Sequence, residues 1–428
     1  MDASSRILVF GEGISFAHVS RAFMIAQTLQ SRGATVRFVS SPRYAEWATQ
    51  RGLDARPAYT PDAEKVYSRL RAMRAMYTRR EIEQSVRADL AEIEAFQPTV
   101  LVGDCRNSLR ISSELSNIPY VAISNANCTP WFAGTINAPA ALPLNRIVGK
   151  PRVDRYVMPW LGGPIQSLAC RAMNQPFAQA QRTFGATRPC RDFRVMFTSD
   201  DLHLLADLPQ FQPTKNRPAH AQYIGPLFWG DDTEHKSATE QLLDQIDPAK
   251  PLVYLSMGSS GLHALLESTA PVLARLPYQF VVTTAGAAAF SQPADNIHAL
   301  PFASAPQVLT RAAAVVCHGG NGTVYQALSH AVPVIAIPSF FDQEIQADQL
   351  THHQLGLRLE PGEAADQLAT ALDTVIAQPT YRDRLPEWRS WMQQWNAESN
   401  AADAIEQFIA PASPATPTAT TSVPLTSA

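Results

Sequence analysis

The chain has 428 residues, which is long enough for two or three domains that each bury a hydrophobic core. Apolar residues make up 46% of it and charged residues 17%, a composition that is typical of globular proteins and excludes a largely disordered chain. The formal net charge of −3 gives no electrostatic reason to expect nucleic acid as a partner.

The first residues predict a strand–helix–strand unit. We expect a buried strand over residues 6–10, a turn at Gly11-Glu12-Gly13, a helix to residue 30 and a second strand over 35–39. A dinucleotide site is disfavoured, because Phe16 stands where the third glycine of that fingerprint belongs and no acidic residue ends the second strand. This argues against a hydride-transfer enzyme.

Residues 62–96 predict a long helical region rich in arginine, with Met73, Met76 and Tyr77 interleaved. Such a region could lie on an anionic membrane or shape an acceptor cleft, but a solvated helix face is the favoured interpretation. Strands are expected over 99–103 and 120–124, with a helix to residue 117 between them. Residues 125–164 are rich in proline, glycine and aromatics, which predicts an irregular segment that helps line a pocket.

Residues 202–208 predict the last strand of this first domain, and residues 223–226 predict a short strand that leads out of it. The polar stretch 231–250 is predicted to be a linker with a short helix, and a second domain is predicted after it. Residues 252–256 then form a strand that leads through a Gly/Ser turn into a helix, and a further strand follows at 280–283. Helices are expected near 363–378 and 381–409. The tail from Pro411 has too little apolar content to fold and is predicted to be disordered.

The most informative motif begins at His318. An apolar run ends at this histidine, and glycines at 319, 320 and 322 precede a helix-forming segment, which is the pattern of an anion site at a helix N-terminus. A second apolar strand, 332–338, leads to Asp342, about one strand–helix–strand repeat downstream. Both residues should therefore leave the carboxyl ends of neighbouring parallel strands, an arrangement that suits a phosphate attached to a hydroxyl-rich group.

This motif resembles the nucleotide-sugar signature of inverting glycosyltransferases with the GT-B fold, more narrowly the UDP-glycosyltransferases and the antibiotic or macrolide glycosyltransferases. The resemblance implies an α/β protein with two facing doubly wound, Rossmann-like domains, parallel sheets and a C-terminal helix that crosses back to the first domain. We expect an acceptor-binding domain over 1–225, a linker over 226–250, a nucleotide-sugar domain over 251–395, the returning helix over 396–410 and the tail over 411–428.

The resemblance also implies how a donor would be held. His318 and the amides after it should stabilise the diphosphate without a metal or other cofactor. Gln326 departs from the family pattern, since plant members carry a glutamate for the ribose at this position; UDP is the expected nucleotide, and this departure leaves dTDP open. The residues expected to bind diphosphate are His318, Gly320, Asn321, Gly322, Thr323, Ser259 and Ser260; those for the sugar are Asp342 and Gln343; those for the nucleoside are Gln326, Phe302 and Gln307.

His18 is the candidate general base, since the resemblance places a histidine in the loop after the first strand. A helix N-terminus disfavours imidazolium, so the ring is predicted to be neutral near pH 7. Asp104 ends a later parallel strand and should orient the ring. The alternative to a catalytic role is that His18 only packs or caps and that Asp104 only caps the helix that follows it.

These features predict an inverting, metal-independent glycosyltransferase that moves a hexose to a hydroxyl of a small-molecule or lipid-like acceptor. A nucleotide-sugar epimerase of the same fold and a non-catalytic partner protein with a decayed site are the alternatives. The five cysteines are scattered without metal-site spacing, and no apolar run suits a signal peptide or membrane span. A soluble cytoplasmic protein is expected, whose first domain could contact a membrane surface. The sequence does not determine the acceptor, the sugar or the oligomeric state.

Overall fold

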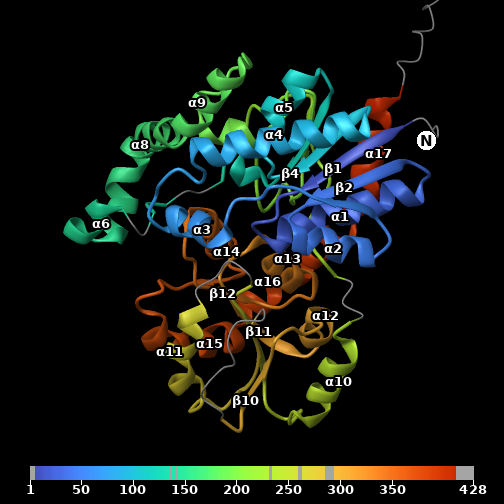
Figure 1. Cartoon of the computed structure of the whole chain (residues 1–428). Coiled ribbons are helices and arrows are strands. Elements are labelled where there is room, and N and C mark those ends of the chain that lie inside the picture. Colours follow the sequence, from blue (N-terminus) through green and yellow to red (C-terminus); the bar gives the residue numbers. More distant parts are fainter. Residues whose placement is uncertain are drawn as a thin grey trace, which may run out of the picture.

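The computed structural model describes residues 5–134, 137–139, 142–230, 234–258, 263–284 and 294–410. Within these ranges the chain folds into two α/β domains, each built on one parallel sheet, and Figure 1 shows them facing each other. This arrangement confirms the predicted pair of doubly wound domains. The described residues do not include Ser259 and Ser260. They also do not include the tail over 411–428, for which the sequence predicts disorder.

The first domain contains a seven-stranded sheet with the order β3-β2-β1-β4-β5-β6-β7. Its central strands β1 and β4 are buried except for Arg6 and apolar except for Arg6 and Asp104 at their ends, as expected of a parallel sheet covered on both faces. The strand order reverses between β1 and β4, so the loops after these strands open a crevice at the carboxyl edge of the sheet. The strands are β1 (Arg6–Gly11), β2 (Thr35–Ser40), β3 (Asp54–Pro57), β4 (Val100–Asp104), β5 (Tyr120–Ser124), β6 (Leu202–Leu205) and β7 (Ala221–Tyr223).

The helices of this domain differ from the sequence prediction in two places. The helical region expected over 62–96 is divided, because α3 ends at Arg71 and α4 begins after Thr78, which forms a capping box with Glu81. The irregular segment expected over 125–164 contains helices that each begin with a proline in the first turn, where proline starts a helix, although α8 also carries Pro164 in its interior. The helices are α1 (Phe16–Ser31), α2 (Pro42–Gln50), α3 (Ala63–Arg71), α4 (Arg79–Phe96), α5 (Leu109–Ser116), η1 (Ala126–Cys128), α6 (Pro143–Val148), α7 (Lys150–Arg152), η2 (Val153–Val157), α8 (Met158–Met173), α9 (Gln175–Phe184) and η3 (Phe193–Phe197).

The second domain contains a six-stranded parallel sheet with the order β10-β9-β8-β11-β12-β13, which reverses between β8 and β11. The sequence did not predict β3, β10 and β13, and all three are edge strands, which need fewer apolar residues because they pair on one side. The strands are β8 (Leu252–Ser256), β9 (Gln279–Thr283), β10 (Ile297–Leu300), β11 (Ala312–Cys317), β12 (Val334–Ala336) and β13 (Gly356–Arg358).

The last helix returns to the first domain. The helix expected over 381–409 is two helices, and Asn396 caps the second of them by accepting from the Ser399 N–H. Ala401 and Ile405 of α17 belong to the same buried core as Val19 of α1, which confirms the predicted crossing. The helices are α10 (Lys236–Gln245), α11 (His263–Leu273), α12 (Ala305–Leu309), α13 (Asn321–Ser329), α14 (Phe341–His352), α15 (Ala364–Ala377), α16 (Pro379–Gln393) and α17 (Ala397–Ile409).

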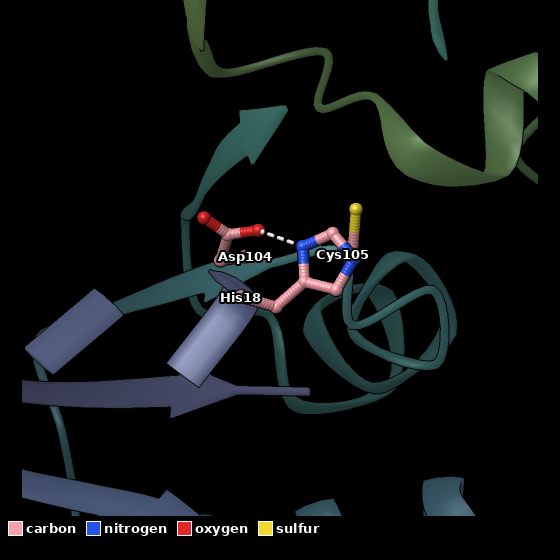
Figure 2. A group of neighbouring side chains, drawn as sticks. All are labelled: His18, Asp104 and Cys105. Atoms are coloured by element: carbon pink, nitrogen blue, oxygen red, sulfur yellow. Dashed lines mark hydrogen bonds and ion pairs between the residues drawn. The ribbon is translucent and has the colours of Figure 1, made fainter. Parts of the chain in front are cut away.

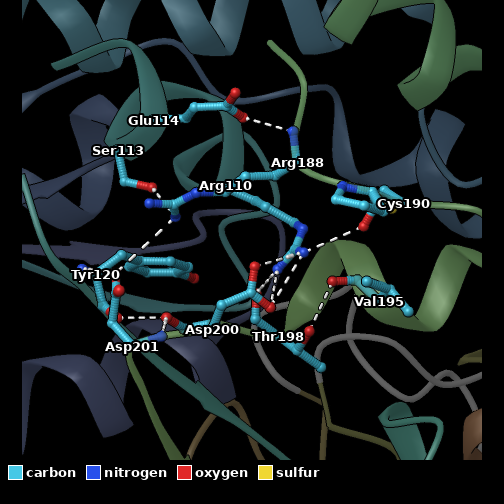
Figure 3. A network of polar contacts seen from close by, with 12 residues as sticks. Arg110, Ser113, Glu114, Tyr120, Arg188, Cys190, Val195, Thr198, Asp200 and Asp201 are labelled. Carbon is cyan, nitrogen blue, oxygen red and sulfur yellow. Dashed lines mark hydrogen bonds and ion pairs between the residues drawn. The ribbon is translucent and has the colours of Figure 1, made fainter. Parts of the chain in front are cut away.

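A buried arginine fixes the segment that leads into β6 (Figure 3). The Arg110 guanidinium donates to the carbonyl oxygens of Pro189 and Thr198 and to the Asp200 carboxylate, at 2.9 to 3.3 Å. A buried cation requires such a set of acceptors. Glu114, also on α5, accepts from the backbone N–H of Arg188. The chain between α9 and β6 is therefore held against α5.

The two domains also pack directly on each other. Phe211, which follows β6 in the chain, is fully buried and lies edge-on against Tyr325 and Trp388, with ring centroids 5.6 and 5.7 Å apart. The side-chain amide of Gln212 donates to Gln346 of α14 at 2.8 Å. These contacts fix the position of one wall of the interdomain cleft relative to the other.

The substitution Ile405→Ala should lower the free energy of unfolding by about 2–5 kcal/mol, because it removes a buried side chain from the core shared by α1 and α17. Urea unfolding monitored by tryptophan fluorescence measures this change. Asp403→Ala on the exposed face of the same helix is the control and should change stability by less than about 1 kcal/mol, although it breaks the ion pair with Arg32. Equal effects of the two substitutions would contradict the packing described.

Candidate functional site

His18 and Asp104 meet at the reversal point of the first sheet (Figure 2). His18 lies in the first turn of α1, just after β1, and Asp104 is the last residue of the neighbouring strand β4. His18 Nδ1 lies 2.9 Å from Asp104 Oδ1. An ionised carboxylate can only accept, so Nδ1 carries the proton, and in the neutral ring the lone pair is on Nε2. The His18 side chain is 21% exposed, toward the cleft, whereas Asp104 is fully buried.

Arg21 is a member of this group that the sequence analysis did not identify. Its guanidinium binds both oxygens of Asp104, each at 2.7 Å, and donates to Asn125 Oδ1 at 2.8 Å. His18 and Arg21 are three residues apart and therefore lie on one face of α1. No local pattern in the sequence identifies Arg21, because its partners Asp104 and Asn125 lie 83 and 104 residues away in the chain.

The charges of this group decide the protonation of His18. Burial lowers the pKa of His18, but Cys105 and the Asp104 carboxylate outweigh it and raise the pKa to about 10. This direction contradicts the prediction of a neutral ring near pH 7, because Cys105 and Asp104 together raise the pKa of His18 by more than burial lowers it. Burial would raise the pKa of Asp104, but Arg21 and His18 hold it below its usual value, so Asp104 stays ionised.

A chain of hydrogen bonds leads from this group into the second domain. Asn125 binds Arg21 through its oxygen and donates from its amide to Asp207 at 3.1 Å. Asp207, which is fully buried, also accepts from the Tyr325 hydroxyl at 3.0 Å and from the Asn321 amide at 3.1 Å. Burial raises the pKa of Asp207, and these donors oppose the rise. Helix α13 of the second domain is thus tied to the first.

The His318 loop lies at the reversal point of the second sheet. His318 follows β11 and is buried, and Gly319 adopts a φ of +80°, which glycine tolerates best. Gly320 is the N-cap of α13, and an added Cβ there would lie 2.2 Å from His318 Nε2. The ring is thus packed directly against the glycine turn, at the positive end of the helix dipole. Asn321, Gly322 and Thr323 line the cleft beside it.

The predicted sugar-binding residues also lie at the cleft, in the first turn of α14. Asp342 Oδ1 accepts from the Asn127 amide of the first domain at 2.5 Å. Burial raises the pKa of Asp342, and Asn127 opposes the rise. The side-chain oxygen of Gln343 accepts from both the backbone N–H and the hydroxyl of Ser339 at 2.9 Å, which fixes the loop before α14.

Two of the three predicted nucleoside residues line the cleft. Phe302 stacks on His235, with ring centroids 5.4 Å apart at an interplanar angle of 15°. The Gln326 amide donates to the carbonyl of Trp229, whose ring lines the same part of the cleft. Gln307 does not line the cleft and instead borders a separate hollow beside α10, whereas its neighbour Pro306 borders both.

The cleft has a volume of about 920 Å³ and combines a polar floor with largely apolar walls. The floor carries His18, Asp342 and His318. The walls include a group of aromatic rings from the first domain, in which Phe16 packs edge-on against Trp47 at 5.4 Å. Helix α8 forms another apolar wall. A cleft of this size suits a substrate with a polar reacting end and an apolar body.

His18, Asp104 and Cys105 form a grouping whose ligand atoms all lie within 4.8 Å of one another, and such a grouping could in principle hold a metal ion. Arg21, however, binds both oxygens of Asp104. A metal ion would have to displace this guanidinium, so the residues do not fit a metal site.

Comparison with known proteins places these features in a family. Residues 272–403 match the family described as "Erythromycin biosynthesis protein CIII-like, C-terminal domain". A "PGL/p-HBAD biosynthesis glycosyltransferase" of Mycobacterium tuberculosis (strain ATCC 25177 / H37Ra) is 31% identical over 379 residues, which cover 88% of this chain and 86% of the relative. A "PGL/p-HBAD biosynthesis rhamnosyltransferase" of Mycobacterium bovis (strain BCG / Pasteur 1173P2) is 30% identical over 381 residues, covering 88% and 82%.

Solved structures support the fold. The glycosyltransferase VinC in complex with dTDP superposes with a TM-score of 0.62 and 17% sequence identity, covering 95% of this chain and 99% of that one. At this identity the similarity establishes the arrangement of domains and not the ligands.

The substitution Asp104→Asn should lower the pKa of His18 from about 10, because it removes the carboxylate that stabilises the imidazolium and leaves the Arg21 charge beside the ring. NMR titration of ¹³C-labelled histidine measures the pKa, and His18→Gln assigns the signal. The buried His203, whose pKa is lowered to about 3, is the internal control and should not change. A His18 pKa near 6.5 in both proteins would contradict the assigned role of Asp104.

Proposed function

This chain belongs to the glycosyltransferase family of its mycobacterial relatives, and from this premise we propose that it is an inverting, metal-independent hexosyltransferase. It would use a nucleotide-diphosphate sugar as donor and a hydroxyl of a lipid-like or other largely apolar molecule as acceptor. The observation that carries the proposal is the His18–Asp104 pair, which faces the same cleft as the His318 loop of the other domain.

The proposed reaction is a single displacement at the anomeric carbon. Neutral His18 accepts the proton of the acceptor hydroxyl at Nε2, while the oxygen attacks the anomeric carbon and the bond to the diphosphate breaks. Asp104 stabilises the imidazolium that forms. His318 and the N–H groups at the start of α13 stabilise the charge that develops on the leaving diphosphate. Because only the neutral ring can accept a proton, the rate should increase as the pH rises toward the pKa of His18.

The donor assignment is supported by the cleft residues beside the start of α13. Phe302 exposes 42% of its surface and offers a face on which a base can stack, and Gln326 and Trp229 lie nearby. UDP is the proposed nucleotide and dTDP the alternative, since the structural neighbour VinC binds dTDP. Asp342 and Gln343 are the proposed ligands of the sugar hydroxyls, with Asn127 as a further candidate because it already binds Asp342.

The acceptor assignment is supported by the apolar walls of the cleft and by the names of the relatives, which act in PGL/p-HBAD biosynthesis. We therefore propose a glycolipid precursor or a similar lipid-like molecule. The epimerase alternative is not supported, because the relatives are transferases. The non-catalytic alternative would require a decayed site, whereas His18 and Asp104 remain within hydrogen-bond distance.

Two substitutions separate donor binding from chemistry. UDP or dTDP at about one hundred times its dissociation constant should stabilise the native protein by roughly 2.7 kcal/mol, which is visible as a rise in melting temperature. His318→Ala should abolish this rise, because it removes a donor to the diphosphate. His18→Ala is the matched control, and it should keep the rise but reduce acceptor-dependent transfer by about 10²–10⁴-fold.

NAD is the negative control of the thermal measurement, since no site for it is expected. If neither nucleotide diphosphate stabilises the native protein, the donor site is wrong. If donor alone yields an isomerised sugar, the protein is an epimerase and not a transferase.

A further inference from the structure

The segment from α6 to α8 forms an arm at the edge of the first domain, beside α9, and Figure 1 shows it extending away from the sheet. Large apolar side chains are exposed along this arm. Ile147 is 83% exposed, Trp160 82% and Leu168 72%, and Tyr156 and Leu161 are also more than half exposed. Exposed apolar side chains of this size and density on a folded protein mark an interaction surface.

Helix α8 has two apolar faces with different surroundings. One face lines the interdomain cleft, and the opposite face carries Trp160, Leu161 and Leu168. Helix α8 therefore separates the cleft from the surrounding solvent by the width of a single helix. The cleft-lining residues recur at helical spacing and are Met158, Gly162, Gly163, Gln166, Ala169, Cys170 and Met173.

The arm is basic in a protein that is acidic overall. Residues 142–173 contain five lysines or arginines and a single acidic residue, Asp154, whereas the whole chain has a net charge of −3. Lys150 pairs with Asp154 at 2.9 Å, while Arg152, Arg155 and Arg171 are exposed. Tryptophan and tyrosine beside basic residues are the side chains that favour the interface of an anionic bilayer.

The arginine-rich region of α3 and α4, the earlier candidate for membrane contact, has a different character. Arg69 pairs with Glu81, Arg71 with Glu64 and Arg79 with Glu83, each at 2.6 Å. These pairs reduce the positive field of that surface. Among the described residues, no helix is both long and apolar enough to span a bilayer, so any attachment through them would be peripheral.

We propose that the arm formed by residues 142–173 docks on the surface of an anionic lipid bilayer. Trp160, Leu161 and Leu168 enter the interface, and Arg152, Arg155 and Arg171 bind the lipid headgroups. Docking brings the cleft wall formed by α8 to the membrane, so that a lipid-like acceptor reaches His18 without crossing water. The last step rests on the acceptor class proposed above, whereas the docking itself does not.

Sedimentation with vesicles tests the docking. The native protein should pellet with vesicles of phosphatidylcholine and phosphatidylglycerol, far less with phosphatidylcholine alone, and less at high salt. The triple variant Trp160→Ser/Leu161→Ser/Leu168→Ser should lower the vesicle affinity at least tenfold. Arg152→Gln/Arg155→Gln/Arg171→Gln should remove the preference for the anionic lipid. Leu115→Ser, which changes an exposed leucine on α5, is the matched control and should bind like the native protein.

Three outcomes would overturn the docking: no pelleting of native protein, equal pelleting of the triple variant, or a native dimer that the triple variant converts to a monomer in analytical ultracentrifugation. The last would show that a second copy of the chain covers the apolar face. Melting temperatures with and without UDP or dTDP show that the variants are folded. Pelleting without any response to nucleotide would contradict the proposed function alone, and a nucleotide response without pelleting would contradict the docking alone.

Discussion

The burial of two carboxylates, Asp104 and Asp207, is the constraint on which the site depends. Each is fully buried at the place where the two domains meet, and a buried carboxylate is tolerated only when donors surround it. For Asp104 the donors are His18 and Arg21, and for Asp207 they include Asn125 and Tyr325. Because Asn125 also binds Arg21, the two acids belong to one network. The donors of Asp104 lie within the first domain. Asp207 also takes donors from Asn321 and Tyr325 of the second domain, so its hydrogen bonds favour this packing of the domains.

This network explains how a reaction centre can be assembled from two domains. The first sheet supplies a histidine at its reversal point, and the second supplies a helix N-terminus at its own. Neither can act alone, since proton removal and stabilisation of the leaving group must occur on one substrate. The hydrogen bonds through Asp207 set the distance between them, and the aromatic contacts of Phe211 surround this link with apolar side chains.

The sequence predicted those parts of the fold and site that depend on local patterns. The central strands are apolar runs, and the glycines around His318 are adjacent in sequence, so both were predictable. The edge strand β3 contains Asp54 and Arg56 and was missed. Arg21 and Asp207 were also missed, because their partners are more than 80 residues away in the chain. The protonation of His18 was predicted wrongly for the same reason, since it depends on charges contributed by another strand.

The proposed base, His18, and the proposed donor loop of the other domain are linked by a coupling through Asn125 and Asp207. A double-mutant cycle on acceptor-dependent transfer tests it, with Arg21→Lys on one side and Tyr325→Phe on the other. These residues share no hydrogen-bond partner, yet we expect a coupling of about 0.5–3 kcal/mol, so the double variant should lose less activity than the product of the single losses. Losses that multiply within error would contradict the coupling.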